Sequence, residues 1–302
     1  MHDPSIQQAG VLVLGNFDGV HRGHQALVEL AGKIAAKADD RPVGILSFTP
    51  HPRRFFVPDS APDRLCNDVQ KREWLKAAGA DFVSLEPFDA DIAAMSPETF
   101  VRDLLVKTYA PHTVIVGYNF RFGQGRAGSA ETLKELGQTY GFQVHIAEAV
   151  TADGSVISSS RIRALISAGD LDAAAELLGR PFTISGPVVH GDKRGREIGY
   201  PTANQTLNAY LRPPYGIYAV RVQTADKHWH NGVANLGVRP MFAVETPLLE
   251  TFIFDFDGMI YDQRLDVALI ARLRDEKKFA SIEALVIQMD KDSQTARRLL
   301  EK

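Results

Sequence analysis

The sequence contains a single cysteine, Cys66, among its 302 residues, so no disulfide can form within the chain. A lone thiol fits a reducing compartment, and we expect a cytoplasmic protein. No apolar run approaches the roughly 20 residues that a membrane-spanning helix needs, and the N-terminus lacks a basic segment followed by an apolar one. We therefore expect no membrane partner and no secretory leader.

An excess of positive charge is also missing, since 34 Lys and Arg face 37 Asp and Glu and the net charge is −3. This balance gives no support for a nucleic-acid-binding surface. The pattern Gly-x-x-x-x-Gly-Lys-[Ser/Thr] does not occur, which excludes a P-loop kinase. The hydrophobic fraction of 45% and the charged fraction of 24% are ordinary for a globular protein. The length is sufficient for two domains.

Residues 15–24, Gly-Asn-Phe-Asp-Gly-Val-His-Arg-Gly-His, lie between an apolar run at 11–14 and a segment with helical apolar spacing at 25–37. A strand, a turn and a helix in this order place backbone amides and the positive helix end where an anion can bind. His21 and His24 lie on one side of the helix start, where neutral imidazoles can donate to a phosphate. Gly19 permits the turn, and Gly23 leaves room for a phosphate or base.

Two other interpretations of the histidines remain open from the residues alone. One is an ordinary surface histidine at a helix start. The other is a pair of metal ligands, although no nearby cysteine or carboxylate pattern completes a zinc set.

Strand-like runs at 43–48, 82–85, 113–116 and 143–146 alternate with helical segments, one of which begins at Ser96. This order predicts a parallel, doubly wound, Rossmann-like α/β sheet. The turn at 15–24 and residues 50–52 and 117–119 should then converge at the carboxyl ends of the strands. The Gly-x-Gly-x-x-Gly pattern at 123–128 follows the fourth strand instead of the first, so we predict a loop there and no dinucleotide site.

Residues 15–24 resemble the signature of the HxGH nucleotidyltransferases, and in this longer form the N-terminal module of bacterial bifunctional riboflavin kinase/FAD synthetases. The segment Ile-Ser-Ser-Ser-Arg-Ile-Arg at 157–163 is similar to the family segment that binds the triphosphate. Without the resemblance, such serines and arginines are more often helix caps and solvated charges. The resemblance implies that His21 and His24 are catalytic. It implies ATP binding by Gly15, Phe17, Asp18, Gly23, Asn119, Ser158, Ser159, Ser160 and Arg163.

Residues 179–181, Gly-Arg-Pro, end a short helix, and we place a domain boundary there, giving domains 1–180 and 181–302. Short strand-like runs at 182–185, 216–222, 232–235 and 249–254 predict an antiparallel β-barrel or sandwich for the second domain. A terminal helix should begin at Ser281. Its apolar stripe of Ile282, Leu285, Val286 and Met289 is expected to be core.

A glycine-punctuated basic loop at 191–199 leads to Pro201-Thr202-Ala203-Asn204. On an extended chain Thr202 and Asn204 point the same way, and their oxygens are hard ligands that suit Mg²⁺ shared with ATP. Glu250 stands in an apolar β-like run, where a pocket would suit it to take a proton from an alcohol. The alternatives are a solvated basic hairpin and a surface strand glutamate.

Residues 199–204, 235–240, 249–251 and 273–279 resemble, in order, the signatures of riboflavin kinase. The resemblance implies that Glu250 is the base and that Arg274 lies near the flavin. It also implies that Thr202 and Asn204 contact Mg²⁺ and ATP. Departures from the pattern are Gln205, Phe252 and Asp262. We assign ATP binding in this domain to Gly191, Lys193, Gly195, Tyr200, Thr202 and Asn204.

The predicted function is phosphorylation of riboflavin by ATP to FMN, followed by adenylylation of FMN with a second ATP to give FAD and pyrophosphate. One alternative is that a single activity is live. Another is a flavin- or nucleotide-binding regulator without turnover, which would bind flavin and release no pyrophosphate. The expected partners are riboflavin, FMN and ATP, with no nucleic acid. The sequence does not define an oligomer, and a monomer is the starting assumption.

Overall fold

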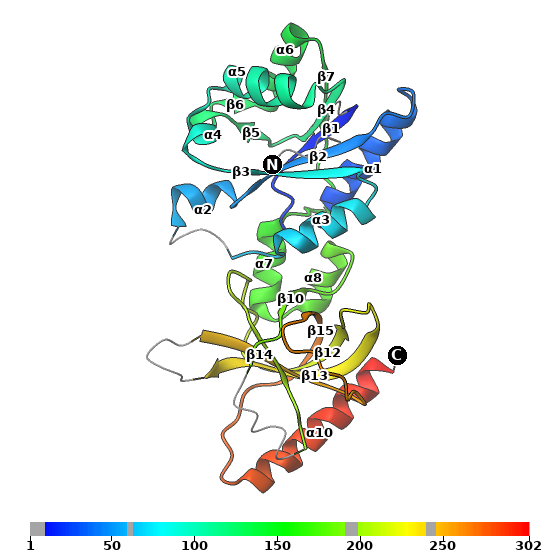
Figure 1. Ribbon diagram of the computed structural model, residues 1–302, viewed down its shortest axis with the longest axis vertical. Helices are drawn as coiled ribbons and strands as arrows, with labels where there is room; N and C mark the ends of the chain where they lie inside the picture. The colour runs from blue at the N-terminus through cyan, green and yellow to red at the C-terminus, as the bar shows by residue number, and fades with distance from the viewer. Residues whose placement is uncertain (1–9, 59–62, 191–198, 240–245, 302) are drawn as a thin grey trace. The chain divides into compact units, whose positions relative to one another are not determined.

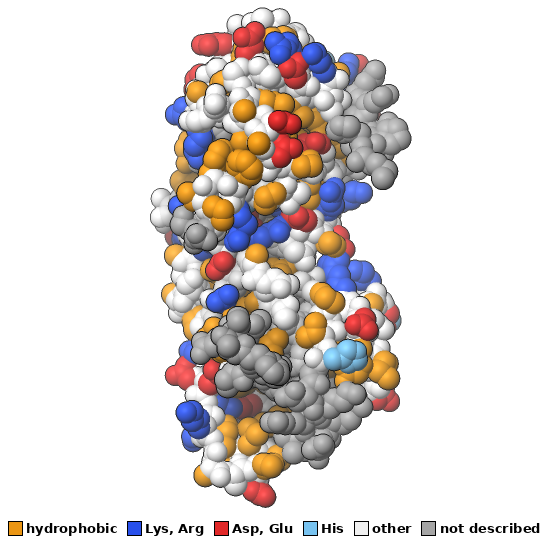
Figure 2. Space-filling view, turned by 60° about the vertical axis from the view of Figure 1, so that its left-hand side comes forward, with side chains coloured by type: hydrophobic (Ala, Val, Ile, Leu, Met, Phe, Trp, Pro, Cys, Tyr) orange, Lys and Arg blue, Asp and Glu red, His pale blue; other side chains and the backbone are white. Residues whose placement is uncertain are grey.

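The computed structural model describes residues 10–58, 63–190, 199–239 and 246–301 (Figure 1). The chain forms two compact units. The first comprises Met1–Pro62 and Asp68–Ser158, and the second comprises Asp63–Asn67 and Ser159–Lys302. In the described ranges, no helix has both the length and the apolar content needed to cross a membrane. On the face that Figure 2 shows, side chains of both charges are interspersed with apolar ones.

The first unit is built on a parallel sheet of five strands in the order β3-β2-β1-β4-β7. The strands are β1 (Val11–Leu14), β2 (Val43–Thr49), β3 (Phe82–Pro87), β4 (Thr113–Gly117) and β7 (Gln143–Ala147). All five predicted strands and their parallel arrangement are therefore confirmed. A doubly wound sheet of this kind exposes the carboxyl ends of its strands at one edge.

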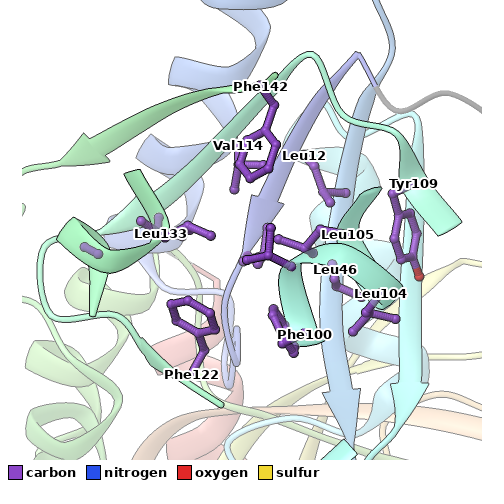
Figure 3. Close-up of a cluster of buried hydrophobic side chains, with 14 residues drawn as sticks. Leu12, Leu46, Phe100, Leu104, Leu105, Tyr109, Val114, Phe122, Leu133 and Phe142 are labelled. Carbon is purple, nitrogen blue, oxygen red and sulfur yellow. The ribbon is translucent and has the colours of Figure 1, made fainter. Parts of the chain in front are cut away.

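Two hydrophobic cores cover the two faces of this sheet because alternate residues of β1 point to opposite sides. Leu12 and Leu14 pack with η3 (Phe100–Tyr109) and α6 (Ala130–Tyr140), as Figure 3 shows. Val11 and Val13 pack on the other side with α1 (Arg22–Ala36) and α3 (Asp68–Ala77). β1 is therefore buried on both faces, which explains its continuous apolar run.

The predicted helix start at Ser96 is confirmed, because its Oγ accepts a hydrogen bond of 3.1 Å from the Thr99 N–H. The helix then continues as the π-helical segment η3, which its apolar spacing did not predict. The predicted loop at 123–128 contains one short 3-10 helix, η4 (Gln124–Arg126), and runs into the short strand β6 (Gly128–Ser129). The remaining elements are α2 (Pro52–Phe56), α4 (Ala90–Ala94), α5 (Pro97–Thr99), β5 (Arg121–Phe122), β8 (Thr151–Ala152) and β9 (Ser155–Val156).

The second unit begins with α7 (Ser159–Ala168) and α8 (Leu171–Leu178). We predicted a border between functional domains at residue 180, and that border stays a prediction, whereas the compact units divide after Ser158. The short segment Asp63–Asn67 also belongs to this unit. The Arg64 N–H donates to the Ala209 carbonyl at 2.8 Å, and the Arg64 carbonyl accepts from the Leu211 N–H at 2.9 Å.

The rest of the second unit is an antiparallel sheet of six strands in the order β10-β15-β12-β13-β14-β11. This arrangement confirms the predicted antiparallel domain. Our strand pattern omitted β11, at one edge of the sheet, and β15, which lies between β10 and β12. The strands are β10 (Thr183–Pro187), β11 (Ala203–Thr206), β12 (Gly216–Gln223), β13 (Trp229–Arg239), β14 (Thr246–Ile253) and β15 (Arg264–Arg274).

The two edges of this sheet are joined by hydrogen bonds that close it toward a barrel. The Val189 N–H, just after β10, donates to the Asn204 carbonyl of β11 at 2.8 Å. Gln205, which is fully buried, donates from Nε2 to the carbonyls of Gly186 and Leu265 at 2.9 and 2.8 Å. These hydrogen bonds explain why a glutamine is accepted at this position, where the riboflavin kinase pattern commonly has an aliphatic residue: its buried amide finds partners across the gap between β11 and the other edge of the sheet.

The terminal helix α10 (Ile282–Leu300) begins at Ser281, whose Oγ accepts from the Ala284 N–H at 3.2 Å, as predicted. The prediction that its first apolar stripe is core was wrong, because none of the four side chains is buried: Ile282 is 63% exposed, and Leu285, Val286 and Met289 are half-buried. The buried residues lie in the second half of the helix, where Ala296 and Leu300 pack with Ala219 and Phe254. The stripe lies on the part of α10 that precedes this contact.

We expect Gln205→Leu to lower the free energy of unfolding of the second unit by about 2 kcal/mol, because two seam carbonyls lose a buried donor. The measurement is calorimetric unfolding of the full chain. Gln294→Leu, at an exposed position on α10, is the matched control and should change stability by less than about 0.5 kcal/mol. Equal stability of the two variants would contradict a role for Gln205 in closure.

Candidate functional site

The turn between β1 and α1 holds its backbone in a conformation that most residues avoid. Phe17 has φ of 49°, Gly19 has φ of 80° and Val20 has φ of 41°. The glycine was expected, but a positive φ at a β-branched valine is a strained exception. Both Phe17 and Val20 are fully buried in the core below α1, and this burial offsets the strain.

The two histidines lie together at the start of α1, as predicted. His21 is the N-cap residue, and its ring stacks on that of His24 with centroids 3.6 Å apart and planes at 18°. The Phe17 ring meets His24 edge to face at 5.1 Å. A Cβ added at Gly23 would lie 3.2 Å from the His21 imidazole, so the space beside Gly23 is bordered by that ring.

The loops expected beside this turn lie at the same edge of the sheet, because β2 and β4 flank β1 in parallel. After β2, His51 caps α2 by accepting from the Arg53 N–H at 3.1 Å. After β4, the exposed Asn119 turns its Oδ1 back toward Gly117. The Ile157 carbonyl lies 3.7 Å from a Cβ added at Gly23, so the chain leading to Ser158 also passes this edge.

The rest of the predicted triphosphate segment lies in the second unit. Ser159, Ser160 and Arg163 form the first turns of α7, and Arg163 Nε donates to the Asp63 carbonyl at 2.8 Å. Their contact with a triphosphate stays a prediction.

A cluster of aromatic rings at the carboxyl edge was missed by the sequence reasoning. Phe48 is the next-to-last residue of β2, Phe88 follows β3, and Phe55 and Phe56 lie on α2. The rings of Phe55, Phe56 and Phe88 have centroids 5.3 to 5.8 Å apart, and Phe56 is 58% exposed. The cluster offers apolar surface to a planar ligand. The available signal was the pair of phenylalanines next to residues 50–52.

In the second unit, three polar side chains stand side by side on adjacent strands. Glu250 of β14 is directly opposite Asn204 of β11 and Asn235 of β13. Asn235 Nδ2 lies 3.5 Å from a Glu250 carboxylate oxygen. Asn204 is 7% exposed, and its Oδ1 has no hydrogen-bond partner within the described ranges. Asn235 begins the 235–240 motif, but the sequence assigns it no role, because strand register is not visible in a sequence.

Tyr200 and Arg274 make firm contacts with α10. The Tyr200 hydroxyl donates to Asp290, and burial together with this bond raises the pKa of Tyr200 to about 12. Arg274 forms a bidentate ion pair with the buried Asp292, with N–O distances of 2.6 to 3.0 Å. The roles of Tyr200 in ATP binding and of Arg274 near a flavin stay predictions. Gly191, Lys193 and Gly195 lie outside the described residues.

A parallel α/β unit with an HxGH turn, followed by an antiparallel unit with a partly buried row of amides and a carboxylate, defines a two-part nucleotide-using transferase. The family model described as FAD synthetase matches residues 3–161, and the one described as riboflavin kinase matches residues 178–300. The chain belongs to the family of bifunctional riboflavin kinase/FMN adenylyltransferases. It has both activities, with ATP as substrate and FMN and FAD as products.

Two relatives carry the name bifunctional riboflavin kinase/FMN adenylyltransferase. The Escherichia coli K12 protein is 40% identical over 96% of this chain and 93% of its own. The Bacillus subtilis protein is 35% identical over 97% and 93%. A solved structure titled macrolide-efflux protein, from Streptococcus pneumoniae, is 32% identical with a TM-score of 0.83, over 98% of this chain and 95% of that one.

We expect Gly23→Ala to lower FAD formation at least about tenfold, because the new methyl group displaces the His21 ring while the helix itself favours alanine. Gly32→Ala, on the same helix, is the matched control, because a Cβ added at Gly32 would have no neighbouring atom within 4 Å. It should raise stability by about 0.5–1 kcal/mol and leave both activities within twofold. FAD formation from FMN and thermal unfolding are measured for each variant. Full activity of Gly23→Ala would show that this space is not needed.

Proposed function

We propose that the two reactions use separate sites, with adenylyl transfer at the HxGH turn and phosphorylation at the Asn204–Glu250–Asn235 row. The observation that carries this proposal is that each compact unit gathers its own chemical cluster. The stacked histidines lie in the first unit, and the polar row lies in the second.

In adenylyl transfer, an oxygen of the FMN phosphate attacks the α-phosphorus of ATP, and the bond from that phosphorus to pyrophosphate breaks. The attacking group is already an anion and needs no base. His21 and His24 donate to the charge that builds on the phosphoryl oxygens, next to the positive end of α1. Ser158, Ser159, Ser160 and Arg163 hold the leaving pyrophosphate. The adenosine and α-phosphate side is assigned to Gly15, Phe17, Asp18, Gly23 and Asn119.

The isoalloxazine ring of FMN is proposed to lie against the aromatic cluster of Phe55, Phe56 and Phe88. Phe55 and Phe56 are exposed and Phe88 is half-buried, at the edge of the sheet that carries the HxGH turn. A flat, conjugated ligand gains both apolar burial and ring contact on such a surface.

In the kinase reaction, Glu250 accepts the proton of the ribityl 5′-hydroxyl as its oxygen attacks the γ-phosphorus of ATP, and ADP leaves. Asn235 orients the Glu250 carboxylate from the neighbouring strand. ATP is held by Tyr200, Thr202 and Asn204 together with Gly191, Lys193 and Gly195. Arg274, fixed by Asp292, is assigned to the flavin side. Positioning and charge neutralisation account for most of such a phosphoryl transfer.

Mg²⁺ fits the oxygens of Thr202 and Asn204, since Asn204 Oδ1 is buried and makes no hydrogen bond with the described residues. Among those residues no group of three or more His, Cys, Asp or Glu could hold a metal. That pattern agrees with Mg²⁺, which is commonly bound through few protein ligands together with substrate phosphates. When bound, the ion would neutralise charge on the ATP phosphates.

The proposed partners are riboflavin, FMN and ATP. The single cysteine, Cys66, is buried and can form no disulfide within the chain, which fits a reducing compartment, and we place the enzyme in the cytoplasm. A monomer and the lack of a nucleic-acid partner stay predictions.

His24→Ala should lower FAD formation about 100-fold or more and leave FMN formation unchanged, since only the first site loses a donor. Glu250→Gln should lower FMN formation by a similar factor, while FAD still forms when FMN is supplied. Both products are resolved by chromatography after incubation with ATP, magnesium and riboflavin or FMN.

His145→Ala, at an exposed position on β7, is the matched control for the histidine and should retain both activities. A folded variant in which one of these single changes abolishes both reactions would contradict separate sites. If the wild-type chain makes FMN but no FAD, the alternative that only one of the two activities is present would hold.

Asn204→Ala should raise the Mg²⁺ concentration for half-maximal FMN formation roughly tenfold, because one oxygen ligand is lost. The Mg²⁺ dependence of FAD formation, measured on the same preparation, is the internal control and should not move. An equal shift in both reactions would mean that Asn204 acts on the whole fold and not on the metal.

A further inference from the structure

Lys71 is a buried cation that the proposed mechanism does not use. It lies on α3, its exposed fraction is 4%, and its ammonium group donates to the Asn16 carbonyl at 2.9 Å. Within the described ranges no carboxylate forms an ion pair with it. Burying an ammonium group without a counter-charge costs stability, so a methionine would suit packing better. A lysine at this position therefore calls for a role other than packing.

The carbonyl that Lys71 holds is the entry to the strained turn. Asn16 follows Gly15 and precedes Phe17, the first residue with positive φ. The same carbonyl accepts a second hydrogen bond of 3.2 Å from Ser47 Oγ of β2. At the other end of the turn, Gln25 Nε2 donates to the Val20 carbonyl at 2.8 Å. Side chains from three elements thus hold both ends of the turn that presents His21.

Helix α3 is fixed in place independently of Lys71, so it can act as a rigid support. At its first residue, Asp68 accepts from Thr49 Oγ1 of β2 at 2.7 Å. One residue beyond Lys71, Arg72 donates to the Val83 carbonyl of β3 at 2.7 Å. The ammonium group is therefore delivered to the turn from a helix that is tied to two strands.

We propose that Lys71 is a positioning residue for adenylyl transfer. It fixes the Asn16 carbonyl, and through it the turn that orients His21 and His24, and it puts a positive charge behind the place where ATP phosphates bind. A charge in a poorly hydrated interior acts more strongly than one at the surface. This proposal rests on the adenylyl-transfer site proposed above.

Three variants separate the hydrogen bond from the charge. Lys71→Met removes both at similar length, Lys71→Gln keeps a donor without the charge, and Lys71→Arg keeps both. Lys76→Met, at an exposed position of the same helix, is the matched control. The turnover number and the KM for ATP are measured for FAD formation from FMN, and FMN formation from riboflavin is measured on the same preparations.

For Lys71→Met we expect kcat of FAD formation to fall at least about tenfold and by a larger factor than KM rises, because the histidines act in the transition state. Lys71→Arg should recover activity above the methionine variant, with Lys71→Gln between them. FMN formation should stay within twofold in all variants, and Lys76→Met should match the wild type. Unchanged kcat in Lys71→Met overturns the proposal.

Two further measurements keep the test decisive. If Lys71→Met does not fold, Ser47→Ala removes the other donor to the same carbonyl, and it should lower kcat of FAD formation about two- to fivefold. Unchanged kcat in that variant then overturns the proposal. If His24→Ala retains FAD formation, the site assignment itself fails. If His24→Ala loses FAD formation while Lys71→Met keeps it, only the role of Lys71 fails.

Discussion

The strained turn between β1 and α1 is the constraint on which the first unit depends. Two residues other than glycine, Phe17 and Val20, hold positive φ, and each such residue costs on the order of 1–3 kcal/mol. Full burial of their side chains stabilises the fold by a similar amount, about 1.5–3 kcal/mol for each. Packing of the core below α1 therefore also fixes the position of the histidines. A substitution that loosens this core should displace the two imidazole rings.

In the second unit, the register of the strands determines which side chains meet at the proposed kinase site. Glu250 faces Asn204 and Asn235 only because β14 pairs with β11 and β13 in this alignment. A shift by one residue would turn Glu250 to the other face and bring Leu249 or Thr251 into the row. The buried amide of Gln205 helps to hold this alignment, since it joins β11 to carbonyls of the far edge strand β10 and of its neighbour β15.

Much of this architecture could be predicted from the sequence, because the parallel strands are continuous apolar runs and the helix starts carry recognisable caps. The position of both histidines on one side of the helix start was predicted from their spacing, whereas the stacking of their rings was not. Contacts made by distant segments could not be predicted: the polar row depends on register, the aromatic cluster on how α2 lies against the residue after β3, and the support of Asn16 by Lys71 on tertiary packing. The apolar stripe of α10 misled because helical periodicity does not say which turn of a helix has a partner.

The segment Asp63–Asn67 has a consequence for how the polypeptide can be divided. These five residues come from the first third of the chain, yet they bury Leu65 and Cys66 and hydrogen-bond to Ala209, Leu211 and Ser185 in the second unit. The chain thus passes between the units three times. A gene cut anywhere between them yields a C-terminal fragment that lacks a piece of its own core. A fusion or domain exchange that uses the kinase half must therefore include residues Asp63–Asn67.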